Sequence, residues 1–186
     1  MDPGSLRFGR DSARAGGFTL IELLVVVAII LILISIALPS FLAAVTRSNI
    51  TASYGDMRSL GTALEMYNVD YKQYPQSALN FAGRRLRFLT TPVAYMGSIP
   101  RDRFASDDSD RTYNFGAMDL DRATRWILAG RGPDRSGDTD PIDFYPGFDP
   151  YLFIGLIPNF KYMAYSPTNG TISKGDLYFA SDGNML

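Results

Sequence analysis

A long apolar segment near the start of the chain most constrains its fold. No polar side chain occurs from Leu23 to Ile34. Between Phe18 and Ala44, the apolar sequence is interrupted only by Thr19, Glu22, Ser35, Pro39 and Ser40. As an α-helix this segment would be roughly 40 Å long, enough to cross a hydrocarbon core of about 30 Å. Because a helix satisfies its backbone hydrogen bonds internally, we expect residues 18–44 to form a transmembrane helix.

One acidic residue lies inside the apolar start. Glu22 is about one helical turn into the segment, where an unpaired carboxylate is energetically costly. A simple membrane anchor explains the length of the segment, but neither Glu22 nor the glycine before Phe18. A secretory signal peptide would have a shorter apolar core ending in small residues, which the sequence around Pro39 does not match. A buried helix of a soluble protein is disfavoured by the uninterrupted apolar run. Glu22 therefore requires a partner.

The residues at this end resemble the type III signal of type IV prepilins and type II secretion pseudopilins: Gly17-Phe18-Thr19-Leu20-Ile21-Glu22-Leu23-Leu24. In that family a membrane-bound prepilin peptidase cuts after the glycine and methylates the new terminal amine. The resemblance implies cleavage between Gly17 and Phe18, with Phe18 as the N-methylated first residue and Glu22 as the acidic assembly residue. Pro39 matches the helix proline of the family, whereas Leu31 stands where the family has a glycine.

The composition excludes several function classes. The 186-residue chain has no cysteine and no histidine. A disulfide framework, a thiolate or histidine metal site and a Ser-His-Asp triad are therefore excluded. The formal net charge of −1 gives no general attraction to nucleic acid. We expect a protein that is not an enzyme and does not bind nucleic acid directly.

The pattern of charges predicts the domain organisation. Residues 1–17 form the expected leader peptide, whose three arginines and two aspartates give a net charge of 3 − 2 = +1. Positive residues beside a membrane span favour the cytoplasmic side. We therefore expect a single-pass membrane protein, with residues 45–186 forming a globular extracytoplasmic domain. The resemblance to prepilins implies that the membrane is the bacterial inner membrane and that this domain lies in the periplasm.

The periodicity of the remaining sequence predicts an α+β fold, and the resemblance to prepilins implies that it is pilin-like. Apolar residues recur every three or four positions from Ile50 to Tyr71, so the helix should continue past Pro39 and pack one face on a small antiparallel sheet. Residues 113–118 and 125–129 are rich in β-favouring side chains and predict a first hairpin. Residues 170–173 and 176–180 flank Lys174-Gly175 and predict a second.

An acidic loop follows the strand predicted at 125–129. Asp134, Asp138 and Asp140 lie close together in sequence among glycines, and calcium is bound by such carboxylate and carbonyl oxygens. Spacing alone favours a solvated acidic loop. The stretch also resembles the calcium site that follows a strand in major pseudopilins, which implies Asp134, Asp138 and Asp140 as calcium ligands.

Together these features predict a structural subunit of a type II secretion pseudopilus or of a type IV pilus-like filament. It would be processed by prepilin peptidase and would assemble through its N-terminal helix into a helical homo-oligomer. The implied partners are the inner-membrane assembly platform and minor pseudopilins. The alternative is a membrane-anchored periplasmic binding domain that does not polymerise.

Overall fold

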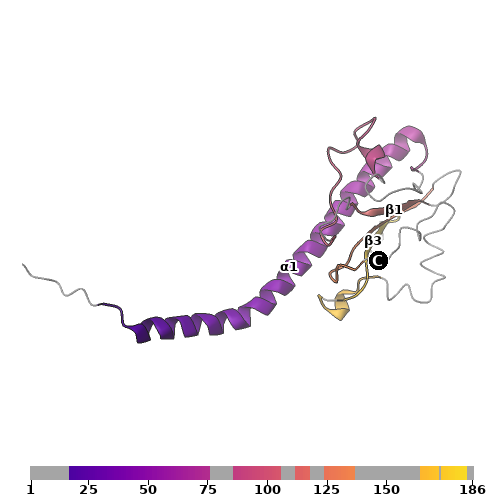
Figure 1. Ribbon diagram of the computed structural model, residues 1–186. Helices are drawn as coiled ribbons and strands as arrows, with labels where there is room; N and C mark the ends of the chain where they lie inside the picture. Colours follow the sequence, from indigo (N-terminus) through magenta and orange to yellow (C-terminus); the bar gives the residue numbers. More distant parts are fainter. Residues whose placement is uncertain are drawn as a thin grey trace, which may run out of the picture. The chain divides into compact units, whose positions relative to one another are not determined.

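The computed structural model describes residues 17–75, 86–105, 112–117, 124–136, 164–171 and 173–183. The chain divides into two compact units, residues 1–41 and residues 42–186. Helix α1 (Leu20–Tyr71) begins in the first unit and ends in the second. The other elements of the second unit are η1 (Arg87–Leu89), β1 (Asn114–Ala117), β2 (Trp126–Gly130), η3 (Pro167–Asn169) and β3 (Leu177–Ala180) (Figure 1).

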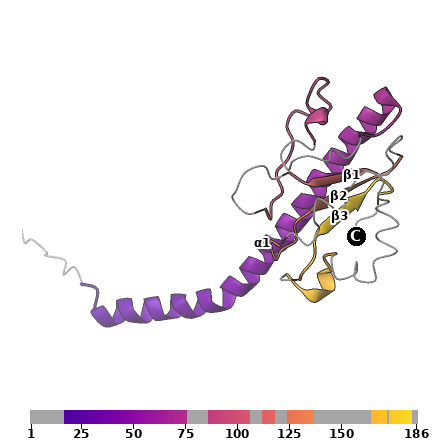
Figure 2. The same ribbon diagram turned by 45° about the vertical axis from the view of Figure 1, so that its right-hand side comes forward.

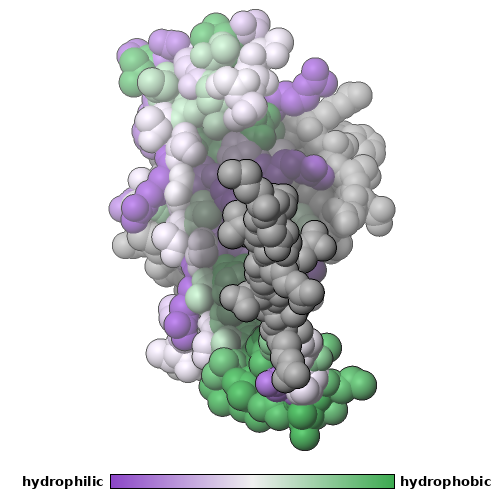
Figure 3. Space-filling model, turned by 90° about the vertical axis from the view of Figure 1, so that its left-hand side faces the viewer, coloured by the Kyte–Doolittle hydropathy of each residue, from purple (hydrophilic) through white to green (hydrophobic). Residues whose placement is uncertain are grey.

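Helix α1 continues through its proline, as predicted. It spans 52 residues with Pro39 inside it, because a proline removes one backbone hydrogen bond and leaves the rest of the ladder in place. The large apolar side chains of the first unit are exposed, from Phe18 to Phe41. They form a contiguous hydrophobic surface in Figure 3. Within the described residues, α1 alone is long and apolar enough to cross a membrane.

The second half of α1 buries the predicted apolar stripe. Met57, Leu60 and Leu64 are fully buried in a core shared with the sheet. Burial of each such side chain contributes about 1.5–3 kcal/mol to folding. Tyr71, the last member of the stripe, is 46% exposed and stacks on Tyr67 with ring centroids 4.4 Å apart. Most residues of the stripe therefore belong to the core, whereas its last residue, Tyr71, lies at the surface.

The three strands form one antiparallel sheet in the order β1-β2-β3 (Figure 2). The predicted first hairpin is confirmed, with Phe115 opposite Leu128 in the β1–β2 register. On its other side Leu128 lies opposite Phe179 of β3. All five residues of β2 are buried, as expected for a central strand between two neighbours.

The predicted second hairpin is wrong. The strand at 177–180 forms, but it pairs with β2, and the described residues Gly170, Thr171 and Ser173 belong to no strand. Gly170 has a φ of 86° and ends η3, and its N–H donates to the carbonyl of Pro167 (3.3 Å). The N–H of Ser173 in turn donates to the carbonyl of Gly170 (3.4 Å). The N–H groups of Gly170 and Ser173 are therefore used within local turns and not in a strand ladder.

Two glycines set how closely α1 and the sheet approach. A Cβ on Gly61 of α1 would lie 2.8 Å from Cη2 of Trp126, and a Cβ on Gly130 of β2 would lie 2.7 Å from the ring of Tyr113 and 2.9 Å from Cε of Met57 in α1. All three distances are shorter than a side-chain carbon can tolerate. The aromatic rings therefore occupy the volume that any other residue at these positions would need.

Candidate functional site at the helix start and the acidic loop

The start of α1 is closed by a capping box. The backbone N–H of Glu22 donates to Oγ1 of Thr19 (3.3 Å), and the backbone N–H of Thr19 donates to Oε2 of Glu22 (2.8 Å). The Thr19 hydroxyl also donates to the same carboxylate oxygen (2.7 Å). These reciprocal bonds satisfy N–H groups that a helix start otherwise leaves unpaired. Glu22 therefore has a partner in its own chain, one that the Thr-x-x-Glu spacing could have revealed.

The predicted cleavage site lies just before this cap. Gly17, Phe18 and Thr19 precede the helix, and all three are exposed. A Cβ on Gly17 would have no atom within 4 Å, so space in the chain itself does not demand glycine there. The side chain of Phe18 is 77% exposed. The Gly17–Phe18 peptide bond thus lies outside the helical hydrogen-bond ladder, in backbone open to another molecule.

Three of the predicted site residues gather at this end and one does not. Gly17, Phe18 and Glu22 lie within six residues of one another. Phe18 and Glu22 line a shallow surface hollow with Ile21, Val25 and Val26. Pro39 is 39 − 22 = 17 residues beyond Glu22, roughly 26 Å farther along a helix with a rise of about 1.5 Å per residue.

Three acidic side chains of α1, which the sequence did not single out, hold the rest of the second unit to the helix. Asp56 accepts from the Tyr113 hydroxyl (3.2 Å) and forms an ion pair with Arg103 (3.0 Å). Glu65 accepts from the Tyr74 hydroxyl (2.8 Å) and from Nε1 of Trp126 (3.2 Å).

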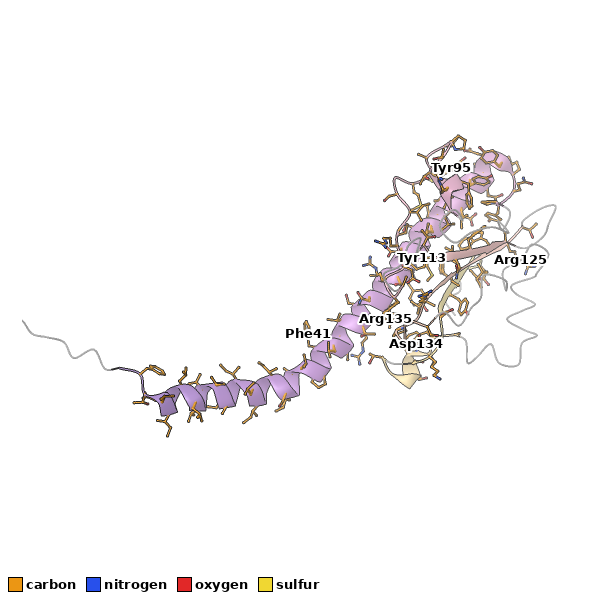
Figure 4. The ribbon with its side chains drawn as sticks, in the orientation of Figure 1. Phe41, Tyr95, Tyr113, Arg125, Asp134 and Arg135 are labelled. Atoms are coloured by element: carbon orange, nitrogen blue, oxygen red, sulfur yellow. The ribbon has the colours of Figure 1, made fainter. Side chains whose placement is uncertain are left out.

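The third of these carboxylates, Asp70, accepts from the Tyr95 hydroxyl (2.7 Å). Figure 4 labels Tyr95 and Tyr113 in this unit. Burial and the Glu65 carboxylate raise the pKa of Tyr74 to about 12. These partners are distant in sequence, so no local pattern could have paired them.

The acidic loop leaves β2 through a defined turn. The N–H of Arg135 donates to the carbonyl of Gly132 (2.9 Å), and the N–H of Ser136 donates to Oδ1 of Asp134 (3.1 Å). Arg135 has a φ of 60°. Asp134 and Arg125 lie beyond opposite ends of β2 (Figure 4). Asp138 and Asp140 lie outside the described residues.

The chemistry of the predicted ligands suits calcium, because carboxylate oxygens are hard donors. Among the residues that the structure describes, no three acidic side chains gather closely enough to hold a metal ion. Of the predicted set only Asp134 belongs to those residues, and it is partly exposed. Calcium binding at this loop therefore stays a prediction.

A buried carboxylate links this turn to another loop. Asp102 is 8% exposed, and its Oδ2 accepts the N–H of Arg131 (2.8 Å) while its Oδ1 accepts the N–H of Phe104 (3.0 Å). Burial raises the pKa of the Asp102 carboxyl, against the opposing effect of these two hydrogen bonds and of the Arg131 charge. No sequence pattern singled out this aspartate.

Comparison with known proteins identifies the N-terminal segment. Residues 12–38 match the family model described as the prokaryotic N-terminal methylation motif. The match includes Gly17, Phe18 and Glu22 and ends one residue before Pro39. No solved structure is significantly similar to the chain.

Similarity to curated proteins extends beyond this motif. The type II secretion system core protein G of Pectobacterium carotovorum is 32% identical over 111 residues, which are 56% of this chain and 71% of the relative. Core protein G of Dickeya chrysanthemi is 25% identical over 135 residues, 68% of this chain and 83% of the relative. The type IV wide pilus major component PilA4 of Thermus thermophilus is 45% identical over 88 residues, 46% of this chain and 64% of the relative.

These similarities agree with a helix that can anchor the chain in a membrane and pack on an antiparallel sheet. Family membership implies processing by a prepilin peptidase and self-assembly into a filament. Proteins of this kind are structural and not enzymes. The chain belongs to the family of pilins and pseudopilins that carry the N-terminal methylation motif and include type II secretion core protein G.

Proposed function

We propose that the chain is a subunit of a type II secretion pseudopilus. The second candidate is a subunit of a type IV pilus or of a DNA-uptake filament. The observation that carries this choice is the extent of similarity. Among five core protein G relatives, three match 53–68% of the chain and two match 33–34%, whereas the match to PilA4 covers 46%. The most extensive of these matches, over 53–68% of the chain, are thus to core protein G and not to the pilins.

The maturation that we propose begins at the membrane. The apolar half of α1 holds the precursor in the bacterial inner membrane as a single pass, with the C-terminal domain in the periplasm. Prepilin peptidase cleaves between Gly17 and Phe18 and methylates the new amine of Phe18. The exposed, non-helical backbone at this bond supports the proposal, because a protease needs access to an unwound segment. An inner-membrane assembly platform and minor pseudopilins then act as partners in filament growth.

Glu22 is the residue that we propose to guide assembly. Cleavage places a positive amine on Phe18 in the same apolar layer as Glu22. Two observations support this role: the Glu22 carboxylate accepts hydrogen bonds from Thr19, and it borders an exposed hollow. The carboxylate is therefore accessible and can exchange its bonds to Thr19 for the amine of a neighbouring subunit. When the amine of an incoming subunit pairs with Glu22 of a neighbour, both charges are neutralised and the axial register is fixed. Screw-related copies joined in this way give contacts that do not close, so the assembly grows as a filament.

Calcium binding by Asp134, Asp138 and Asp140 is a further part of the proposal. Two observations support it. The proposed donors are all carboxylates, and Asp134 is partly exposed on a turn in which its Oδ1 accepts the N–H of Ser136 and the carbonyl of Gly132 accepts the N–H of Arg135. Calcium would join residues of one loop and so rigidify the segment after β2.

The test of the secretion assignment is deletion of the gene in its host, followed by complementation. We expect the deletion strain to lose protein secretion into the medium and to keep its surface pili and DNA uptake. Loss of pili or DNA uptake with normal secretion would instead assign the chain to a pilus. Processed chain that never leaves the membrane fraction for sheared filaments would favour the non-polymerising membrane-anchored binding domain.

A further inference from the structure

The second half of α1 and the sheet border a hollow with a volume of about 410 Å³, which we call the Trp126 groove. The rings of Trp126 and Phe179 line it, with their centroids 5.9 Å apart, beside Gly61, which carries no side chain. Thr62 also lines the groove and is exposed. A hollow of this size with aromatic walls is suited to an apolar group.

Side chains of both charges, Arg58 and Glu65, line the groove as well. The Glu65 carboxylate accepts hydrogen bonds from Nε1 of Trp126 (3.2 Å) and from the hydroxyl of Tyr74 (2.8 Å), so it is engaged within its own chain. Because one positive and one negative charge offset each other, the groove selects neither an anion nor a cation. An uncharged apolar side chain suits it best, since entry removes apolar surface from water.

The same helix offers such a side chain. Phe41 is 64% exposed, and it is labelled on α1 in Figure 4. Apart from Phe18 beside the proposed cut, it is the only aromatic residue in residues 18–45. Aromatic rings pair favourably with one another, and the groove supplies two of them. Phe41 cannot enter the groove of its own chain, because α1 is helical throughout the residues that separate it from Arg58.

The groove is continuous with the assembly surface of the family, since its α1 wall belongs to the helix whose apolar half carries filament assembly. The large apolar side chains of that half are exposed from Phe18 to Phe41. Once a subunit leaves the lipid, protein must cover this apolar surface. A second copy is therefore the partner that brings an apolar side chain to the groove.

We propose that the Trp126 groove receives Phe41 of a second copy in the assembled filament. The inference rests on the proposed function, because it names the surface of one subunit that meets the apolar helix of another. The ring of Phe41 packs on Trp126 and Phe179, and Thr62 borders its entry. The contact joins two different surfaces of the same chain, so it repeats from copy to copy without closing.

The first experiment is cross-linking in sheared filaments with a short bis-maleimide. The chain has no cysteine, so introduced cysteines react only with each other. Ala44→Cys is exposed and lies one helical turn from Phe41, which it leaves intact. Combined with Thr62→Cys in the full chain, it should give a ladder of covalent oligomers. Each single-cysteine chain should stay monomeric, because the contact joins unlike surfaces.

The second experiment blocks the groove. Thr62→Arg places a long charged side chain at its entry, and we expect most of the sheared filament fraction to be lost while leader cleavage continues. Thr51→Arg is the matched control. Thr51 and Thr62 are both exposed on α1, and each hydroxyl donates to the carbonyl four residues earlier (3.1 and 3.0 Å), but Thr51 does not line the groove. Its filament yield should stay close to that of the unmodified chain.

The two proposals fail in different ways. An unmodified chain that is processed but forms no filaments overturns the proposed function, and this inference with it. A normal filament yield from Thr62→Arg, or an equal loss in Thr51→Arg, overturns the groove contact while the filament function stands. Filaments in which the Ala44→Cys and Thr62→Cys pair gives no ladder, or no more than an Ala44→Cys and Thr51→Cys pair, overturn Phe41 as the occupant.

Discussion

Glu22 is a single charge at the start of an exposed apolar helix, and its bonds to Thr19 satisfy it within one chain. A charge near the centre of a membrane helix costs about 2.5–3.5 kcal/mol, and less near the interface. Removing one member of a buried ion pair strands the other, which is worse than removing both. The proposed pairing with the amine of a neighbouring Phe18 is therefore open to a single-residue test.

We predict that Glu22→Gln and Glu22→Ala are cleaved largely as the unmodified chain is, but form far fewer filaments. The neutral variants leave the terminal amine of each incoming subunit without a counter-charge. The measurement compares processed chain in the sheared filament fraction with processed chain in the membrane fraction. A normal filament yield from processed Glu22→Ala would show that assembly does not need the carboxylate.

Gly17 gives a second test at the residue scale. We predict that Gly17→Leu leaves the precursor uncleaved, because the peptidase must accommodate the residue before the scissile bond. Space within the chain itself does not require glycine at this position, so the fold should not change. Intact mass should show the full leader and no methyl group. Ala15→Leu is the control and should still be cleaved, and cleavage at a downstream alanine or serine would contradict the prepilin assignment.

At the scale of elements, the contact between α1 and the sheet depends on glycine at one helical position. Gly61 faces the Trp126 ring, whereas Gly55 lies on the same helix with no atom within 4 Å of a Cβ. Overpacking a core costs about 1–3 kcal/mol, whereas replacing an exposed helical glycine by alanine gains about 0.5–1 kcal/mol.

Gly61→Ala should therefore lower the free energy of unfolding, and Gly55→Ala should raise it. Urea denaturation of the full chain in detergent measures both variants. Equal effects of the two substitutions would mean that the indole ring moves aside at little cost.

The acidic loop carries the second prediction at this scale. If Asp134, Asp138 and Asp140 bind calcium, chelation should lower the melting temperature of the chain. An ion bound only by the native state stabilises it by about 2.7 kcal/mol at a free concentration a hundredfold above the dissociation constant. Asp138→Ala should abolish the calcium-dependent part of the melting temperature. Identical melting temperatures with calcium and with chelator would mean that the loop is solvated and does not bind calcium.

At the scale of the whole molecule, folding raises the pKa of two tyrosines, Tyr54 and Tyr74. Burial and the nearby Tyr165 raise the pKa of Tyr54 to about 12, and burial and Glu65 raise that of Tyr74 to about 12, from an ordinary value of 10.0. A raised pKa means that the native state holds its proton more tightly than the unfolded chain does. The stabilisation is complete below pH 10 and is lost as pH rises toward about 12.

Urea denaturation from neutral pH to about pH 12 should therefore show stability falling above pH 10. Tyr74→Phe should flatten part of this fall, because it removes one of the ionising groups. A free energy of unfolding that stays constant across this range would contradict the tyrosine contribution.

The features that could be predicted from sequence are those whose cause is local. The apolar run predicted the long apolar helix, and the 3.6-residue periodicity predicted its buried face from Ile50 to Tyr67. The first hairpin followed from two β-favouring runs joined by a short polar turn. The Thr-x-x-Glu cap was equally local and could have been found.

The features that could not be predicted depend on residues far apart in the chain. The strand at 177–180 pairs with β2, although the sequence of residues 170–173, which are nearer in the chain, predicted a hairpin with it. Asp56 meets Tyr113 across 57 residues, and Glu65 meets Trp126 across 61. Asp102 meets Arg131 across 29 residues. Nothing in the spacing of these side chains indicates which partners the fold brings together.

The capping box has a consequence for maturation. Within the described residues, the bonds that close the start of α1 are made by residues 19–23, on the C-terminal side of the proposed cut. Removal of the leader therefore breaks none of these bonds, and the first helical turn is already in its final form in the precursor. What the peptidase changes is charge, since it deposits an amine at the positive end of a long helix dipole, beside a first-turn carboxylate that offsets it. Maturation is then an electrostatic event at constant conformation, and precursor and processed chain should share one far-ultraviolet circular dichroism signal for α1.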